Sequence, residues 1–113
     1  MEDCIFCQII NGKSPAEIEY EDPEVLAFRD INPSAPVHIL VIPKKHINSL
    51  NEITENDQEL LGKIMLAIKQ IAQKRNLVDD GYRVVINCGP NAGQIVNHLH
   101  FHLLGGKKFH NLH

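Results

Sequence analysis

The sequence has no tryptophan, few aromatic residues of any kind and no long apolar run. Its longest mostly apolar stretch lies near residues 37–42, far short of the roughly 20 residues that a membrane-spanning helix needs. The first residues, MEDCIF, contain neither the basic nor the apolar segment of a secretory signal peptide. We therefore expect a cytoplasmic protein with no membrane partner.

An excess of positive charge is also lacking. The chain has 11 Lys and Arg against 14 Asp and Glu, which gives a formal net charge of −3. A broad nucleic-acid-binding surface needs clustered positive charge, so we expect no nucleic-acid partner. A small anionic ligand held by local groups remains compatible with this composition.

Cysteine is scarce, with three in the chain, and Cys4 and Cys7 form a C-x-x-C. An odd number without a secretion signal argues against a disulfide framework and favours a metal-binding or redox role for the pair. Cys88 has no obvious partner in the sequence, and we expect a free thiol there.

The length suits one domain, which we place at residues 1–113. Short β-rich segments bounded by turn residues predict strands at residues 18–22, 25–30, 37–43, 83–87 and 95–104. Thr54 is expected to cap one long helix. The apolar residues of this helix recur at helical spacing on one face: Leu61, Ile64, Met65, Ile68, Ile71 and Ala72. These elements predict an α+β fold in which the helix covers one face of an antiparallel sheet and the other face is available for a ligand or partner.

Three of the seven histidines lie at alternate positions in HLHFHLL, residues 98–104. Residues two apart in a strand share a face, so His98, His100 and His102 are expected on one face and the apolar residues between them on the other. Three interpretations fit this pattern. The histidines are partly exposed on a solvated face, they form a zinc site together, or one neutral imidazole performs covalent catalysis while its neighbours set its tautomer and charge.

The same segment fits the pattern His-φ-His-φ-His-φ-φ, with φ apolar, of the histidine triad (HIT) superfamily. Three longer segments resemble its histidine triad nucleotide-binding (Hint) branch, in the same order: FRDINPSAPVHILVIPKKHI, GYRVVIN and GQIVNHLHFHLLGG. The likeness extends from about Cys4 to Gly106. It implies a HIT-like fold with a five-stranded antiparallel sheet, one long helix and a short N-terminal helix.

The resemblance implies a hydrolase that cleaves purine nucleoside 5′-phosphoramidates or aminoacyl adenylates and releases AMP. Three histidines match residues of its active site. His100 matches the histidine that attacks the α-phosphorus and forms a nucleotidyl-histidine, which water then cleaves. His102 matches the histidine placed to contact the phosphate and the leaving group. His38 matches a further histidine near the nucleophile, although a hydrogen-bonded core histidine explains it equally well. The family likeness also implies a homodimer.

Two other functions stay open at this point. One is a dinucleoside polyphosphate hydrolase, from a sister branch of the superfamily. The other is a nucleotide-binding or scaffold protein without catalysis. The Hint-like segments favour the phosphoramidase, and the presence of all three histidines argues mildly against a protein that only binds.

The resemblance also implies a nucleotide pocket. Asp30 and Ile31 match positions that hold the ribose hydroxyls and contact the base, although Asp30 alone would be taken for a turn residue. Asn87 matches a phosphate or sugar contact, and Gly93 and Gln94 belong to the loop before the triad. The next residue, Ile95, departs from the pattern, because well-known Hint members often have serine there. A backbone contact survives this change, whereas a side-chain hydrogen bond to the leaving group does not.

Cys4 and Cys7 have the spacing of half a zinc site, and His46 and His98 are the candidates for the other half. Many family members with an N-terminal C-x-x-C bind zinc with two cysteines and two such histidines. The resemblance therefore implies a structural zinc ion, which leaves His100 and His102 for chemistry. A redox C-x-x-C and two cysteines that merely pack are the alternatives.

Overall fold

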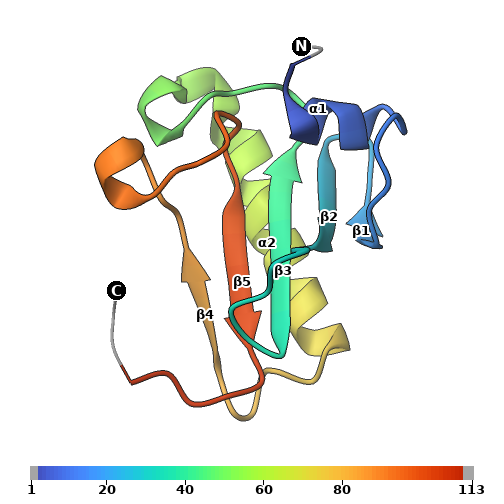
Figure 1. The fold of residues 1–113 in the computed structure, drawn as a ribbon, viewed down its shortest axis with the longest axis vertical. Coiled ribbons are helices and arrows are strands. Elements are labelled where there is room, and N and C mark those ends of the chain that lie inside the picture. The colour runs from blue at the N-terminus through green and yellow to red at the C-terminus, as the bar shows by residue number, and fades with distance from the viewer. Residues whose placement is uncertain (1–2, 111–113) are drawn as a thin grey trace.

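Five antiparallel strands form one sheet in the order β1-β2-β3-β5-β4, with helices on both faces (Figure 1). The computed structural model describes residues 3–110. In chain order the elements are α1 (Ile5–Ile10), β1 (Ile18–Glu21), β2 (Val25–Arg29), β3 (Val37–Pro43), α2 (Gln58–Lys74), β4 (Tyr82–Val85) and β5 (Phe101–Gly105). This confirms the predicted α+β class, with its long helix and short N-terminal helix.

The predicted last strand is wrong in its first half. Residues 95–104 were expected to be extended throughout, but β5 begins only at Phe101, so His98 and His100 precede it. The antiparallel ladder with β3 ends at the pair Val41 and Phe101, and the next hydrogen-bonded pair, Pro43 and Leu99, would need a backbone N–H from Pro43, which has none. Before that point the chain bonds to the segment that follows β3, through Leu99 N–H and the carbonyl oxygen of Ile47 (2.7 Å).

The long helix starts as expected. The Thr54 hydroxyl and the Asp57 carboxylate cap each other's backbone N–H groups in a capping box, and a single 3-10 turn over Glu55–Asp57 leads into α2. Met65 was expected on the buried face but is 46% exposed. It follows Ile64 by one residue, which turns it about 100° around the helix axis and away from the sheet. Within residues 3–110, no helix combines the length and apolar content needed to cross a membrane.

The apolar spacers of the triad pack under α2, as the alternation predicts. Leu99, Phe101 and Leu103 are 1%, 2% and 0% exposed and lie in the core between the sheet and α2. The opposite face is partly covered by α1, whose Phe6 packs edge-on against Phe28 of β2 with ring centroids 5.4 Å apart. Only the part of this sheet face that α1 does not cover is therefore available for a ligand or partner (Figure 1).

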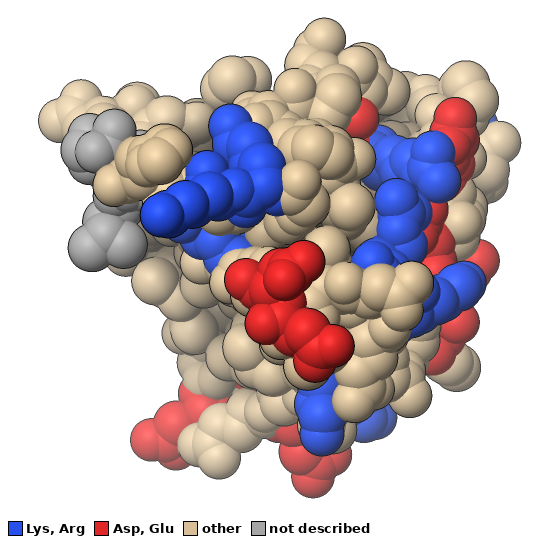
Figure 2. All heavy atoms as spheres, turned by 90° about the horizontal axis from the view of Figure 1, so that it is seen from below, with Lys and Arg blue, Asp and Glu red and all other residues tan. Residues whose placement is uncertain are grey.

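Charged side chains of both signs lie side by side on the face of the molecule shown in Figure 2. One ion-pair group ties the end of α2 to the edge of the sheet, because the Glu19 carboxylate accepts hydrogen bonds from Arg29 (2.9 Å) and Arg75 (3.0 Å). Burial alone would raise the pKa of Glu19, but these two guanidinium groups lower it below its usual value.

Gly105→Ala is expected to lower the free energy of unfolding by about 1–3 kcal/mol. An alanine Cβ at this position would lie 2.7 Å from Cδ2 and 2.9 Å from Cδ1 of Leu77, which is itself buried. Urea unfolding monitored by circular dichroism measures the change. The control is Gly62→Ala in α2, where an added Cβ meets no atom within 4 Å. It should raise stability by up to about 1 kcal/mol. Wild-type stability in Gly105→Ala would contradict this packing.

Candidate active site

A cavity of about 450 Å³ opens on the sheet face beside α1. It is lined by α1, by the end of β2 and the turn that follows it, by the loop before the triad and by the triad itself. Most of the residues expected to bind or react with a nucleotide line it: Asp30, Ile31, Asn87, Gly93, Ile95, His100 and His102. His38 and Gln94 do not line the cavity, but each forms a hydrogen bond with a residue that does, His102 and Val96 respectively.

His100 has a defined tautomer. Its Nδ1 lies 2.7 Å from the carbonyl oxygen of His98, and the residue is 7% exposed. A carbonyl only accepts hydrogen bonds, so Nδ1 carries the proton of the neutral ring and Nε2 keeps a lone pair. The ring is also fixed by Phe6, which packs edge-on against it with centroids 5.2 Å apart. In the neutral form of this ring, the lone pair is therefore on Nε2.

His102 has the opposite tautomer, which a chain of hydrogen bonds sets. The backbone N–H of Ser34 donates to His38 Nδ1 (2.9 Å), so the proton of His38 is on Nε2. That Nε2–H lies 2.9 Å from His102 Nδ1 and donates to it, which leaves the proton of neutral His102 on its own Nε2. The carboxylate of Asp30 lies 3.4 Å from His38 Nε2 and favours a proton there. His38 thus acts on the site through His102.

Burial keeps both of these rings neutral. Burial, together with the neighbouring His100 and His38, lowers the pKa of His102 to about 4, against an opposing effect of the Asp30 carboxylate. Burial also lowers the pKa of His38, against an opposing effect of the Asp30 carboxylate. The hydrogen bonds therefore assign the neutral rings an acceptor nitrogen on His100 and a donor nitrogen on His102, with ring centroids 5.0 Å apart.

The rim of the cavity combines one carboxylate with exposed apolar side chains. Asp30 Oδ1 accepts the backbone N–H of Asn32 (2.8 Å), which fixes the carboxylate in its turn. Ile31 is 88% exposed and Ile95 is 91% exposed, although both line the cavity. The Asn87 amide donates to the carbonyl oxygen of Ala92 (2.9 Å), so it also holds the loop before the triad in place.

The Gln94 side chain braces that loop. Its Oε1 accepts the backbone N–H of Gly89 (2.9 Å), and its Nε2 donates to the carbonyl oxygens of Asn48 (2.8 Å) and Val96 (3.0 Å). Gly89 and Gly93 have φ angles of 87° and 86°, a region that favours glycine. Gln94 therefore joins the loop to the segment after β3, a role that the sequence did not indicate.

Cys4, Cys7, His46 and His98 come together from both ends of the chain, and their ligand atoms all lie within 4.8 Å of one another. His98 Nδ1 lies 3.5 Å from Cys4 Sγ and 3.7 Å from Cys7 Sγ, and His46 Nδ1 lies 3.2 Å from Cys7 Sγ. Sulfur and nitrogen ligands on one tetrahedral zinc ion are separated by roughly 3.6 Å. The spacing and the Cys₂His₂ donor set therefore fit zinc.

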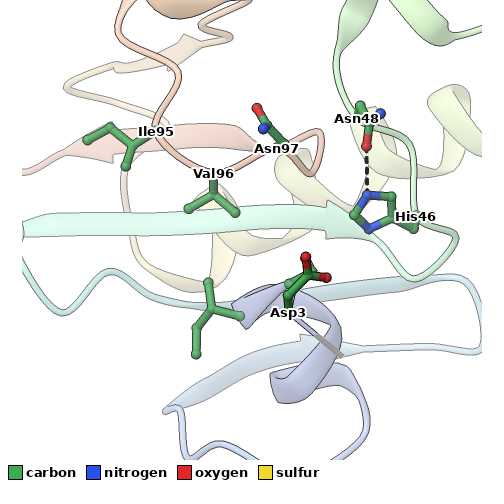
Figure 3. Close-up of a pocket in the computed structure, with 8 residues that line it drawn as sticks. Asp3, His46, Asn48, Ile95, Val96 and Asn97 are labelled. Atoms are coloured by element: carbon green, nitrogen blue, oxygen red, sulfur yellow. Dashed lines mark hydrogen bonds between the residues drawn. The ribbon is translucent and has the colours of Figure 1, made fainter. Parts of the chain in front are cut away.

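The second nitrogens of the two histidines are already engaged. His98 Nε2–H donates to the carbonyl oxygen of Pro43 (2.8 Å), and His46 Nε2–H donates to Asn48 Oδ1 (2.8 Å), the bond drawn in Figure 3. Both rings thus turn an unprotonated Nδ1 toward the cysteines, as metal ligands do.

A second group of possible ligands, Asp30, His38 and His102, also lies close together. There the 2.9 Å contact between His38 and His102 is a hydrogen bond, shorter than two ligand nitrogens on one ion would be.

The contribution of α1 to the cavity was not predicted from the sequence. Ile5, Phe6 and Ile9 all line it. The signal was present, because Ile5 and Ile9 are four residues apart and share a helix face beside the C-x-x-C. Ser34 was missed as well, since its contribution is a backbone N–H that any residue would supply.

Comparison with known proteins agrees with this architecture. A family model described as scavenger mRNA decapping enzyme C-term binding matches residues 3–112. An uncharacterized HIT-like protein from Synechococcus elongatus is 57% identical over 106 residues, which are 94% of this chain and 92% of that protein. A histidine triad protein from Clostridium difficile has a solved structure with a TM-score of 0.95 and 48% identity, covering 100% of this chain and 98% of its own. The chain therefore belongs to the histidine triad family.

The names of two other solved relatives indicate an activity or a bound metal. A HIT family hydrolase from Legionella pneumophila matches with a TM-score of 0.92 and 48% identity, over 94% of this chain and 95% of its own. A zinc-bound histidine triad family protein from Mycobacterium smegmatis matches with a TM-score of 0.79 and 32% identity, over 94% of this chain and 76% of its own. The family relationship thus supports a hydrolase.

Acid is expected to destabilise the protein partly through His102. Its pKa is about 4 in the folded chain and near its ordinary value of about 6.5 in the unfolded chain. The unfolded state therefore binds more protons between these values, and stability falls as the pH falls through that window. In His102→Asn, the amide oxygen can still accept a hydrogen bond from His38. We expect its melting temperature to fall less than that of wild type between about pH 7 and about pH 4.5. Parallel melting curves of both proteins test this, and equal losses would contradict it.

Proposed function

We propose that the protein is a nucleotidyl hydrolase that cleaves purine nucleoside 5′-phosphoramidates, or aminoacyl adenylates, and releases AMP. The observation that carries this proposal is the pair of opposite tautomers in one cavity, with a lone pair on His100 Nε2 and a proton on His102 Nε2. A phosphoryl group needs an attacking atom and a hydrogen-bond donor at the same place. Membership of a family that includes hydrolases supports the same reaction class.

In the first step, His100 Nε2 attacks the α-phosphorus. In a phosphoramidate the bond from phosphorus to the leaving nitrogen breaks and that nitrogen takes up one proton from solvent, whereas in an aminoacyl adenylate the bond from phosphorus to the carboxyl oxygen breaks and a carboxylate leaves. AMP is then left covalently on His100. Water then attacks the same phosphorus, the bond to Nε2 breaks, and one proton returns to solvent. The neutral ring needs no deprotonation before it attacks, and it also leaves phosphorus readily, so one difficult step becomes two easier ones.

His102 acts in both steps as a hydrogen-bond donor. Its Nε2–H stabilises the negative charge that develops on the phosphoryl oxygens and the leaving nitrogen. The hydrogen bond from His38 keeps the Nδ1 of His102 occupied as an acceptor, so the proton stays on the nitrogen that serves the reaction. His38 is therefore proposed as a positioning residue rather than one that touches the substrate.

The remaining lining residues are proposed to bind the nucleotide. The Asp30 carboxylate accepts from the ribose hydroxyls with its remaining lone pairs, and Ile31 packs against the base. Asn87 and the backbone of Gly93 and Ile95 contact the phosphate, in a loop that Gln94 braces. Apolar residues of α1 complete the base side of the cavity.

The Cys4–Cys7–His46–His98 cluster is proposed to hold one structural zinc ion. A bound zinc ion supplies a cross-link between the N-terminal residues, the segment after β3 and the triad. The name of the zinc-bound relative supports this assignment. All four ligands come from the protein, which leaves no open position for a substrate.

A homodimer is proposed as well, on the family likeness and on the edge of the sheet. Strand β4 pairs with β5 on one side only. Tyr82, Val84 and Ile86 along this edge are 39%, 40% and 38% exposed. A second copy that pairs with the same edge would cover these side chains and satisfy the open backbone groups.

His100→Ala is expected to lower the turnover of adenosine 5′-phosphoramidate by about three orders of magnitude or more, because the attacking atom is lost. AMP should still bind, since the other lining groups remain, and calorimetry measures this. The control is His110→Ala, which removes an exposed histidine outside the cavity and should keep full activity. Equal AMP release by wild type and His100→Ala would rule the mechanism out. AMP binding without turnover by wild type would favour a binding protein.

Cys4→Ser is expected to reduce the zinc content from about one ion per chain to near zero, because a hydroxyl is a much weaker zinc ligand than a thiolate. Elemental analysis of protein purified under reducing conditions measures the content. The matched control is Cys88→Ser, since Cys88 is a free thiol outside the cluster. Wild-type protein that contains no zinc would contradict the proposal, as would equal zinc contents in the two variants.

A further inference from the structure

The Asp30 carboxylate lies between the nucleotide cavity and His38. Asp30 lines that cavity, whereas His38 does not. The backbone pairing of β2 with β3 continues past the end of β2, because the Asp30 N–H donates to the carbonyl oxygen of His38 (3.0 Å). This bond holds the two residues together, with Asp30 Oδ2 3.4 Å from His38 Nε2. A ligand that binds Asp30 from the cavity therefore binds a group that is in contact with His38.

The two oxygens of this carboxylate differ in their hydrogen bonds. Oδ1 accepts the backbone N–H of Asn32 (2.8 Å). Within residues 3–110, Oδ2 accepts no hydrogen bond from the protein, and its one ionic contact is with His38 Nε2. The Asp30 side chain is only 19% exposed. A carboxylate oxygen that has lost most of its water is stabilised by a nearby donor, so Oδ2 attracts the ring proton of His38.

His38 has only one ring proton to donate. Its Nδ1 accepts the N–H of Ser34, so the proton of the neutral ring is on Nε2. That proton is donated to His102 Nδ1 (2.9 Å), which leaves the proton of His102 on its own Nε2. Asp30 Oδ2 and His102 Nδ1 are therefore two acceptors beside one donor. Any share of the proton that Asp30 attracts weakens the hydrogen bond that sets the tautomer of His102.

We propose that Asp30 is a positioning residue that couples ribose binding to the tautomer of His102. Ribose hydroxyls that donate to Oδ2 satisfy the carboxylate and leave the His38 proton to His102, which then presents its Nε2–H to the phosphate. Without these hydroxyls His102 is held less firmly, and its other tautomer turns a lone pair toward the phosphate oxygens. This inference rests on the proposed function. It predicts that a nucleotide without ribose hydroxyls loses reaction rate as well as affinity.

The test compares adenosine 5′-phosphoramidate with its 2′,3′-dideoxy form. Single turnovers with saturating protein measure the rate of the bound substrate, separate from binding and product release. Wild type is expected to cleave the ribose substrate about two- to tenfold faster, the effect of one hydrogen bond. Asp30→Asn keeps an acceptor for the Asn32 N–H and replaces the oxygen that faces His38 by an amide group that cannot accept. It should bring the ratio of the two rates to about one.

The matched control is Ile31→Ala, in the same turn. It removes a proposed contact with the base but changes no acceptor near His38. We therefore expect it to weaken the binding of both substrates and to keep the wild-type ratio of the two rates. This control separates poor nucleotide binding from a change in the reacting histidines.

Nitrogen NMR of the His102 ring provides a readout that does not depend on turnover. The AMP complex should have more of its His102 proton on Nε2 than the complex with 2′,3′-dideoxy-AMP, and Asp30→Asn should remove this difference. Identical His102 signals in the two wild-type complexes would overturn the inference.

The rates distinguish this inference from the proposed function. Equal wild-type rates for the two substrates would overturn the inference and leave the hydrolase standing. A rate difference that persists in Asp30→Asn would have the same consequence. No cleavage of either substrate by wild type would overturn both.

Discussion

The fully buried imidazole and backbone of His98 connect the two halves of the site. Its Nδ1 faces Cys4 and Cys7, and its Nε2–H is bound to the carbonyl oxygen of Pro43. Its own carbonyl oxygen accepts the Nδ1–H of His100 and so fixes the tautomer of the proposed nucleophile. One residue thus joins the Cys4–Cys7–His46–His98 cluster, the end of β3 and the proposed nucleophile. A displacement of His98 would change the tautomer and position of His100 together.

Burial sets the chemistry as much as position does. A histidine in water is partly protonated near neutral pH, and a protonated ring has no lone pair to attack with. Here desolvation holds His102 neutral, and hydrogen bonds to groups of fixed polarity assign each ring its proton. The backbone provides two of these groups, the carbonyl of His98 and the N–H of Ser34. Backbone groups do not titrate, so the tautomers of the neutral rings are fixed by partners whose polarity does not change with pH.

Local pattern was enough to predict most of the fold. The apolar run VHILVIP has the same bounds as β3, and Thr54 marks the start of the helical region, because strand length and capping depend on neighbouring residues. The start of β5 could not be predicted in this way. It depends on Pro43, a residue far away in the sequence that lacks the N–H needed for the next pair. The prediction for Met65 was wrong for a different reason, since it lies beside the buried face of the helix, about 100° around the axis from Ile64.

In the candidate site, too, some features could be predicted from the sequence and others depend on contacts between distant residues. The family likeness predicted that Asp30, Asn87, His100 and His102 would meet, and they line one cavity. Their tautomers depend on contacts with Ser34 and His98 that no spacing encodes. Gln94 is a clearer case. A long polar side chain in a glycine-rich loop suggests a ligand contact, yet its amide is taken up by three backbone groups.

The exposed isoleucines at the rim imply that binding and catalysis depend on different residues. Packing of a hydrocarbon chain on Ile95 would be equally favourable in the ground state and in the transition state, because that chain does not change during the reaction. Such contacts lower KM and leave kcat nearly unchanged. In the proposed mechanism, the hydrogen bond from His102 would strengthen as charge develops on the phosphoryl group and would therefore raise kcat. A serine hydroxyl beside the leaving nitrogen would contribute to the second effect. With isoleucine in its place, the proposed mechanism assigns the chemical step to the two histidines alone.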